Sequence, residues 1–260
     1  ARDARTIFSM ILRATGGFAG SLALLTLRDG AIESVEVPSG GSYDFQGQLT
    51  LARIAPQPLH LINSRFELQD ANWWPDFPTS AKKISELYEA TGGPTLDGIA
   101  AITAYLGEDL LAEAGPIRFQ NGEEFTAVNF IDKLQNIIAQ DRLENRKTPK
   151  KIITMLYPAV VAKARELTQS NPKAALAVLV NALQTKDIQL WSRDEKTQAA
   201  LRRLNATGEL KEAEGDYLAV ISSNVGGGKT DGVVKQTIRH RAQITRDGTV
   251  RETVTISRTH

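Results

Sequence analysis

The residues best suited to chemistry lie within seven positions, from Asp70 to Asp76. Asp70, Asn72 and Asp76 supply carboxylate and amide oxygens, and two tryptophans stand between the last two of them. Such oxygens can bind a hard divalent cation, and indole rings can stack on a sugar or an isoprenoid. No Gly and Glu follow at calcium-loop positions, so that motif does not match. The alternative interpretation is that Asp76 or Thr79 caps a helix while the tryptophans anchor a loop to the core.

A glycine-rich turn precedes the first apolar strand, in the segment Arg13–Ser21. Glycine has no side chain, so Gly16 and Gly17 let backbone amides approach a ligand oxygen that side chains would otherwise block. The turn is therefore a candidate anion-binding nest. The alternative is a flexible turn that only reverses the chain.

A second glycine-rich segment, Ser222–Thr230, is similar to a phosphate-binding loop but departs from the motif. The pattern G-x-x-x-x-G-K-[ST] requires Gly at position 223, where this sequence has Ser. A phosphate loop also opens a helix, whereas residues 233–244 read as a strand. Nucleotide hydrolysis is therefore disfavoured, and we expect a turn that presents Asn224 and Lys229 to a ligand.

Composition excludes several classes of chemistry. The chain has no Cys, so disulfides, thiolate nucleophiles and zinc–cysteine sites are ruled out. Its 3 His residues are scattered and no G-x-S-x-G elbow occurs, which disfavours a clustered metal site and a triad hydrolase. The 31 Lys and Arg residues balance 30 Asp and Glu residues, so the chain has no overall field that would hold nucleic acid.

The apolar stretches of the chain, such as 174–183, are shorter than the roughly 20 residues that span a bilayer. The sequence starts at Ala1, without Met and without an apolar leader. We therefore expect a mature or truncated piece whose targeting segment lies outside it.

Hydrophobic periodicity and turn residues predict the elements that must position these side chains. Two apolar runs around Asp29-Gly30 predict a hairpin over 21–37, and its first arm is apolar enough for a central strand buried on both faces. Residues 38–76 predict a long connection that carries binding residues. A helix follows, with Gly92-Gly93 as its stop.

The second half of the chain alternates between helical and strand patterns. A strand over 96–103 and a helix over 105–114 complete the order strand, helix, strand, helix, which predicts a parallel pairing. Sequence with helical periodicity dominates from about 127 to 185, and a capping box at Ser192–Glu195 predicts the start of another helix. Further strands are predicted at 188–191 and 217–222, and a terminal antiparallel hairpin at 233–256.

Together these elements predict the α/β fold class, with a mixed central sheet flanked by helices. We expect one α/β domain over residues 1–260, with a helical insertion at about 127–186 and a C-terminal antiparallel hairpin.

Four blocks of sequence resemble an uncharacterised bacterial family, domain of unknown function 4012. They are Leu12–Ser21, Asp70–Ser80, Leu96–Ile102 and Asn224–Asp231, and they occur in the family's order across most of the chain. In that family a membrane anchor usually precedes the domain. The resemblance therefore implies an extracytoplasmic protein of the cell envelope or bacterial surface, with its membrane anchor outside this chain.

A more distant resemblance is to the LytR-CpsA-Psr envelope phosphotransferases, which transfer glycopolymers from polyprenyl pyrophosphate to peptidoglycan. By this resemblance Arg13, Arg142 and Arg146 would bind pyrophosphate, because paired guanidiniums suit its charge. The resemblance also implies Mg²⁺ as a cofactor. The metal-binding carboxylate and one catalytic arginine of that family have no counterpart. Its Arg-Ser-Asp-Thr motif corresponds to Phe18–Ser21 here, and its Pro-Arg-Asp motif has no counterpart near Val37–Ser39. Any activity is at most phosphotransferase-like, and a scaffold without catalysis is an equal alternative.

Two hypotheses follow. The first is an extracytoplasmic envelope domain that binds a polyprenyl-phosphate-linked or glycan ligand in a loop-lined cleft, with LytR-CpsA-Psr-like glycopolymer transfer as its catalytic extension. The second is a non-catalytic structural or interaction module of a surface assembly, whose terminal hairpin offers a sheet edge to envelope protein partners. The first requires segments 13–21, 70–80 and 141–146 to converge, with ligand-binding residues Arg13, Gly16, Gly17, Asp70, Asn72, Asp76, Arg142, Arg146, Asn224 and Lys229.

Overall fold

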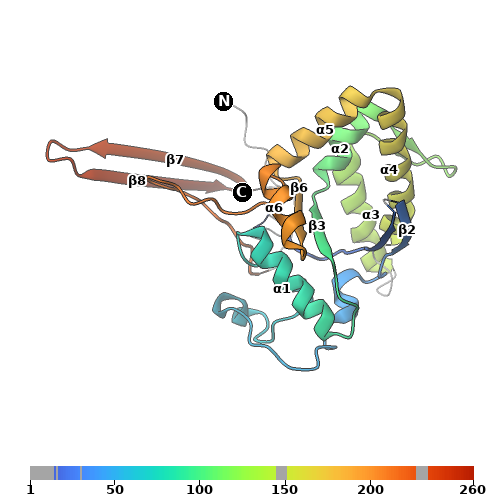
Figure 1. Ribbon diagram of the computed structural model, residues 1–260, viewed down its shortest axis with the longest axis horizontal. Coiled ribbons are helices and arrows are strands. Elements are labelled where there is room, and N and C mark those ends of the chain that lie inside the picture. Colours follow the sequence, from blue (N-terminus) through green and yellow to red (C-terminus); the bar gives the residue numbers. More distant parts are fainter. Residues whose placement is uncertain (1–14, 16, 30, 145–150, 227–233) are drawn as a thin grey trace.

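The computed structural model describes residues 15, 17–29, 31–144, 151–226 and 234–260. In these ranges the chain is a mixed α/β protein with six α-helices and small antiparallel sheets, which confirms the predicted fold class. The described strands form four separate pairs rather than one continuous sheet. Figure 1 shows the helices gathered in one body, from which the C-terminal hairpin projects.

Strands β1 (Leu24–Arg28) and β2 (Ala31–Glu36) form the predicted hairpin around Asp29. Asp29 has a φ of 52°, a left-handed conformation that Asp tolerates better than most residues. The prediction that β1 is central and buried on both faces is wrong. Among the described residues β1 pairs with β2 alone, and this single neighbour leaves Leu25 48% and Leu27 66% exposed.

The long connection over residues 38–76 contains three short 3-10 helices, η1 (Gly41–Phe45), η2 (Gln57–Leu61) and η3 (Leu68–Asp70). Its apolar side chains pack against α1 (Phe77–Ala90), which buries area that would otherwise face water. We name this core cluster 1. Its buried members are Leu49, Ala55, Leu59, Phe66, Leu68, Ala71, Leu87 and Tyr88.

Helix α1 begins where the sequence provides a cap. The Asp76 carboxylate accepts hydrogen bonds from the Thr79 amide at 3.0 Å and from its hydroxyl at 2.6 Å. The first bond satisfies an amide that has no partner within the helix. Pro78 lies in the first turn, where a missing N–H costs nothing. The predicted helix is confirmed, and so is the interpretation of Asp76 as its cap.

Strand β3 (Gly98–Ile102) pairs with β6 (Ile188–Ser192) in an antiparallel register, with Gly98 opposite Ser192 and Ile102 opposite Ile188. The predicted parallel pairing is therefore wrong. Between these strands the chain passes through several helices and a small hairpin of β4 (Ile117–Arg118) and β5 (Glu124–Phe125). An excursion of that length can return in either direction, so the rule for a single crossover helix does not apply.

Helices α2 (Tyr105–Ala114), α3 (Phe130–Glu144) and α4 (Lys151–Ser170) surround a second core, which we name cluster 2. Helix α5 (Pro172–Thr185) packs on α2 and α4. The buried members of cluster 2 are Leu111, Ile117, Phe125, Phe130, Ile131, Ile152 and Leu156. Helices α3, α4 and α5 account for the helical segment predicted at 127–186. That they form an insertion into one domain stays a prediction.

Helix α6 (Glu195–Arg203) follows β6, and its cap is Asp194 rather than the predicted Ser192. The segment 204–226 after it has no strand, so the predicted strand at 217–222 is wrong. Side-chain contacts replace a backbone ladder there. Arg258 donates a hydrogen bond to the Ser222 hydroxyl, and the Asp216 carboxyl lies beside Glu252. The segment therefore lies beside the C-terminal hairpin without pairing with it.

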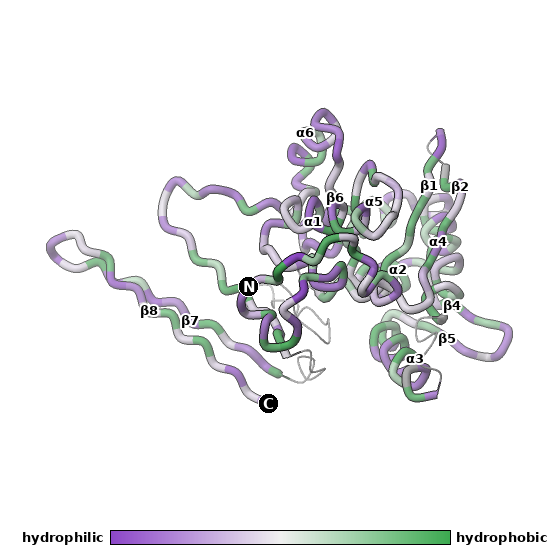
Figure 2. The backbone as a smooth tube through the Cα atoms, turned by 90° about the horizontal axis from the view of Figure 1, so that it is seen from below, coloured by the Kyte–Doolittle hydropathy of each residue, from purple (hydrophilic) through white to green (hydrophobic). Residues whose placement is uncertain are grey.

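The C-terminal hairpin consists of β7 (Lys235–Ile244) and β8 (Val250–Thr259), as predicted. Every residue of both strands is exposed. Figures 1 and 2 both show the hairpin extending away from the helical body. Within the described ranges, no helix combines the length and the hydropathy needed to cross a membrane.

Candidate functional site

Two of the segments singled out in the sequence meet directly, the turn at 15–17 and the block at 70–76. The Asn72 side-chain amide donates to the Gly17 carbonyl oxygen at 2.7 Å, and the Thr15 hydroxyl donates to Asn72 Oδ1. Asn72 is 8% exposed, so these bonds satisfy a buried amide. The structure therefore brings Gly17 and Asn72 together from distant parts of the sequence.

Strand β6 holds the same turn from another side. Gln189 Nε2 donates to the Thr15 carbonyl at 3.0 Å and to the Lys186 carbonyl at 3.3 Å. These contacts engage carbonyl oxygens of the turn, whereas an anion nest would present its amide N–H groups. Gly16 lies outside the described residues, so the nest stays a prediction.

Both carboxylate oxygens of Asp76 already have partners in the fold. Oδ2 accepts from Thr79, and Oδ1 accepts from the Leu210 amide at 3.0 Å. Asp76 thus caps α1 and ties the segment after α6 to it. No group of three or more His, Cys, Asp or Glu residues in the described ranges is placed to bind a metal ion. The Mg²⁺ implied by the resemblance does not fit this block.

The two tryptophans of the block pack against cluster 1. Trp74 meets Phe66 edge to face, with ring centroids 6.0 Å apart, and its amide donates to the Ser80 hydroxyl at 3.0 Å. Both indoles are half-buried, as is Asp70 at the end of η3. Anchoring of the loop to the core therefore accounts for the tryptophans.

The predicted cationic residues are described only in part. Arg13, Arg146 and Lys229 lie outside the described residues. Arg142 belongs to α3, which packs on α2 and α4 around cluster 2, whereas the 70–76 block packs on cluster 1. Asn224 is half-buried in the irregular segment before β7. The convergence of these residues with the turn at 15–17 stays a prediction.

A cleft of about 380 Å³ opens between α1, β6 and α6, and the sequence reasoning did not anticipate it. Its volume falls within the range of about 300–1,000 Å³ found for small-molecule pockets. Helix α1 contributes Lys82, Glu86 and Glu89; Trp191 and Arg193 come from β6 and the residue after it; α6 contributes Glu195, Gln198 and Arg202.

Arg193 fixes one wall of the cleft. Its Nε donates to the Leu96 carbonyl at 2.8 Å, and its Nη2 donates to the Ser85 hydroxyl at 2.9 Å and to Glu89. The Arg193 side chain is 45% exposed, so its ion pair with Glu89 adds little to stability. Its effect is to hold the end of β6 against α1.

The charges around the cleft cancel. Three cations, Lys82, Arg193 and Arg202, face three carboxylates, Glu86, Glu89 and Glu195. Arg202 donates to Glu209 at 2.6 Å, and this hydrogen bond raises the pKa of the Arg202 guanidinium. A balanced set of charges suits a neutral polar ligand better than a phosphate.

Gln198 is the polar group of the cleft with the least complete bonding. It is 3% exposed, and its Oε1 accepts from the Ser192 amide at 2.8 Å. Its buried Nε2 has no hydrogen-bond partner among the described residues. A buried donor left in this state costs about 1–3 kcal/mol. A ligand oxygen that accepts from Nε2 would remove that cost.

The sequence held a faint signal for this cleft. Trp191, Arg193 and Gln198 lie within eight residues, but they read there only as a strand followed by a helix. The carboxylates opposite them come from α1, far earlier in the chain, and only the antiparallel return of β6 brings α6 next to α1.

Residues 11–138 match the model of one protein family, described as Protein of unknown function (DUF4012). The matched region includes the β1–β2 hairpin, α1, β3 and α2, and therefore one wall of the cleft. No curated protein and no solved structure matches the chain.

Proposed function

We propose, from the premise that this chain belongs to the DUF4012 family of unknown function through residues 11–138, that it is a glycan-binding domain of the cell envelope. The glycan occupies the cleft between α1 and α6. The observation that carries the proposal is the buried Gln198 Nε2, which lacks a partner beside the half-buried Trp191. The extracytoplasmic location rests on the family resemblance drawn from the sequence.

Sugars combine the properties that the cleft would recognise. Each sugar hydroxyl both donates and accepts hydrogen bonds, so it can pair with a carboxylate and an amide at once. Glu86 provides acceptors on one wall, and Gln198, whose buried Nε2 has no partner among the described residues, lines the other. Trp191 offers an indole surface on which the apolar face of a sugar ring can stack.

The proposal also covers a glycan carried on a polyprenyl phosphate. Because the cleft has balanced charges, it would bind the sugar portion, and the phosphate would remain outside. We assign no catalytic step to the cleft.

The test is an NMR titration of the protein with a panel of neutral mono- and disaccharides. At least one sugar should shift the amide resonances of β6 and α6. Trp191→Leu should weaken the binding of that sugar about 3- to 10-fold, as expected for loss of an aromatic contact worth about 0.5–1.5 kcal/mol. Gln198→Met should weaken the binding of the sugar by a similar factor, because one hydrogen bond contributes about as much free energy as the aromatic contact.

Trp73→Leu is the matched control, since Trp73 packs on cluster 1 and does not line the cleft. Its affinity should equal that of the unchanged protein, and melting curves would verify that each variant folds. The proposal fails when no sugar shifts the cleft resonances, or when all three variants bind equally well.

A second candidate function is a structural or interaction module of a surface assembly. The exposed C-terminal hairpin favours it, because a two-stranded ribbon of this length offers two free edges to a partner. Cross-linking in native envelopes distinguishes the two functions. A module of this kind captures protein neighbours through β7 or β8, whereas a glycan-binding domain co-purifies with carbohydrate.

A further inference from the structure

The C-terminal hairpin has two chemically different faces. Residues that pair across an antiparallel ladder point to the same side, so the odd-numbered residues of β7 and β8 share one face. Every residue on that face is Lys, Arg, Gln, Thr or Ser. Its cations are Lys235, Arg239, Arg241 and Arg251. We name this surface the basic face.

The cations of the chain are concentrated here. Residues 235–259 contain six Lys and Arg residues and two carboxylates, a net charge of +4. The remainder of the chain, with 25 Lys and Arg residues and 28 carboxylates, has a net charge of −3. The net charge of the whole chain is therefore near zero although its two parts differ. The hairpin is positive, and the remainder of the chain is mildly negative.

Neither carboxylate of the hairpin neutralises the basic face. Asp247 accepts hydrogen bonds from the Thr245 hydroxyl and from the Thr249 amide within the turn. Glu252 has an even number and points to the opposite face, where its Oε2 lies 3.3 Å from His240 Nε2. All the charge on the basic face therefore has one sign.

The opposite face is the one that meets the rest of the protein. It carries the apolar side chains, and segment 216–222 approaches it through the contacts of Asp216 with Glu252 and of Ser222 with Arg258. Val254 on that face is 39% exposed near these contacts, whereas Ile244 toward the tip is 78% exposed. The basic face consequently points away from the chain's own contacts.

Charges on exposed strands often serve only to prevent edge-to-edge aggregation. Charges that serve this purpose need no particular face. The hairpin instead lines up cations of β7 opposite hydroxyls of β8, with Arg239 opposite Thr255 and Arg241 opposite Thr253. This regular row of guanidinium and hydroxyl donors suits a ligand whose hydrogen-bond acceptors repeat along its length.

We propose that the basic face binds a linear phosphate polymer that has no bases. Alternate residues of a strand are about 6.6–6.8 Å apart, so ten-residue strands present donors along about 33 Å. Guanidinium groups bind phosphate oxygens in pairs, and hydroxyls add neutral donors. The hairpin contains no Phe, Tyr or Trp on which nucleic-acid bases could stack. The basic face also has no apolar side chain that could enter a membrane.

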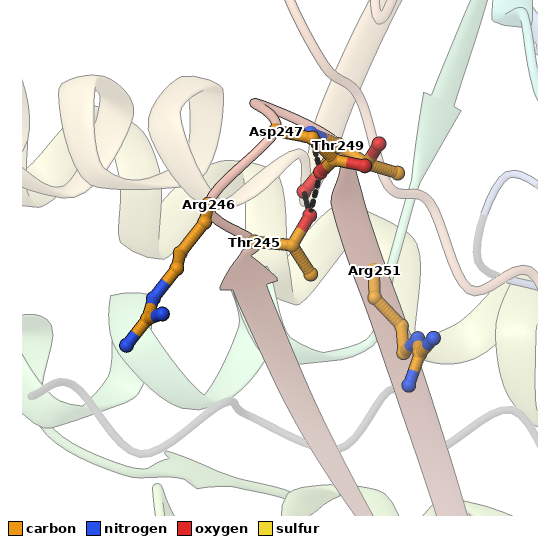
Figure 3. A pocket seen from close by; sticks show the side chains of 5 residues that line it. All are labelled: Thr245, Arg246, Asp247, Thr249 and Arg251. Atoms are coloured by element: carbon orange, nitrogen blue, oxygen red, sulfur yellow. Dashed lines mark hydrogen bonds between the residues drawn. The ribbon is translucent and has the colours of Figure 1, made fainter.

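The tip of the hairpin extends this surface. A shallow cavity of about 420 Å³ is lined there by Thr245, Arg246, Asp247, Thr249 and Arg251. Figure 3 shows Arg246 and Arg251 on either side of the turn, with Asp247 held by the dashed hydrogen bonds inside it. The tip therefore adds a fifth cation, and the Asp247 carboxylate that also lines the cavity accepts hydrogen bonds within the turn.

The experiment measures binding of fluorescent inorganic polyphosphate to the full chain as salt is varied. Five phosphate contacts predict that log affinity falls against log salt with a slope of about −3.5. Pyrophosphate, which spans one contact, should bind far more weakly. The variant R239Q/R241Q/R251Q should lose about tenfold or more in affinity and about 2 units of slope. The triple Lys variant R239K/R241K/R251K should retain most of both.

The matched control is R28Q/R118Q/R203Q, which removes the same charge from exposed positions outside the hairpin. It should bind like the unchanged chain, and a cross-strand NOE between Ile238 and Ile256 checks that the hairpin of each variant is formed. Three results overturn the proposal: no binding of polyphosphate, an equal loss in the control, or equally tight binding of oligo(dT) or phosphatidylglycerol vesicles at the same charge concentration.

Discussion

Gly208 lies where segment 204–226 passes β6, and its conformation leaves no room for a side chain. Its φ is 64°, and an added Cβ would lie 2.1 Å from Gln189 Oε1. Gln189 in turn donates to the Thr15 carbonyl. A single hydrogen atom at position 208 therefore allows three distant parts of the chain to meet.

We expect Gly208→Ala to lower the free energy of unfolding by about 1–3 kcal/mol. The left-handed backbone disfavours Ala, and Gln189 must leave its place. Denaturant unfolding measures the effect.

Gly47→Ala separates the two causes. Gly47 has a φ of 79° and no atom within 4 Å of an added Cβ, so Ala there meets only the backbone penalty. Equal losses at both positions would show that contact with Gln189 contributes nothing.

Single residues also mark what the sequence could reveal. Asp76 was recognisable as a helix cap, because its capping bonds to Thr79 reach only three residues ahead. Asp29 with the following Gly was recognisable as a turn for the same reason. Gln198 was not recognisable, since its unpaired amide depends on a cleft whose other wall lies in α1. The ligand-binding roles of Arg13, Arg146 and Lys229 stay predictions, because these residues lie outside the described ranges.

At the scale of elements, helix α6 depends on a carboxylate cap. The hydroxyl and the amide of Thr197 donate to Asp194, and these bonds lower the pKa of the Asp194 carboxyl. A pKa that is lower in the folded chain gives stability above the ordinary Asp value of about 3.9, and this stability is lost as pH falls through the lowered pKa.

We therefore expect the first turn of α6 to fray below about pH 4. The Thr197 amide resonance in NMR spectra recorded between neutral and acid pH reports the change. Asp194→Asn keeps a capping oxygen without a titrating group, so its α6 should be insensitive over the same interval. An identical acid response in that variant would assign the effect to another group.

The strands illustrate where local patterns stop being informative. Strand positions were predicted well for β3 and β6, but their antiparallel pairing was not, because no residue between Ile102 and Ile188 encodes the direction of return. The apolar run of β1 suggested a central strand, yet exposure depends on how many neighbours the fold supplies. Residues 217–222 have the composition of a strand, but they form side-chain contacts with the hairpin instead of backbone pairing.

At the scale of the whole molecule, two apolar clusters form the body and the hairpin lies outside both. Strands β7 and β8 contact mainly each other. Removing both strands should therefore shift the melting temperature by less than about 4 °C, the change expected for about 1 kcal/mol in a protein of this size. Differential scanning calorimetry measures the shift. A much larger drop would show that the hairpin belongs to the cooperative core.

The hydrogen bonds of the turn at 15–17 also have a mechanical consequence. Asn72 stands just before α1, and Gln189 stands two residues before Trp191, so the turn is fastened to both walls of the cleft. Tension applied to chain ahead of residue 15 would be shared between these two attachments. A pull strong enough to break them would release α1 and β6 together, so the shape of the cleft between them would become sensitive to force.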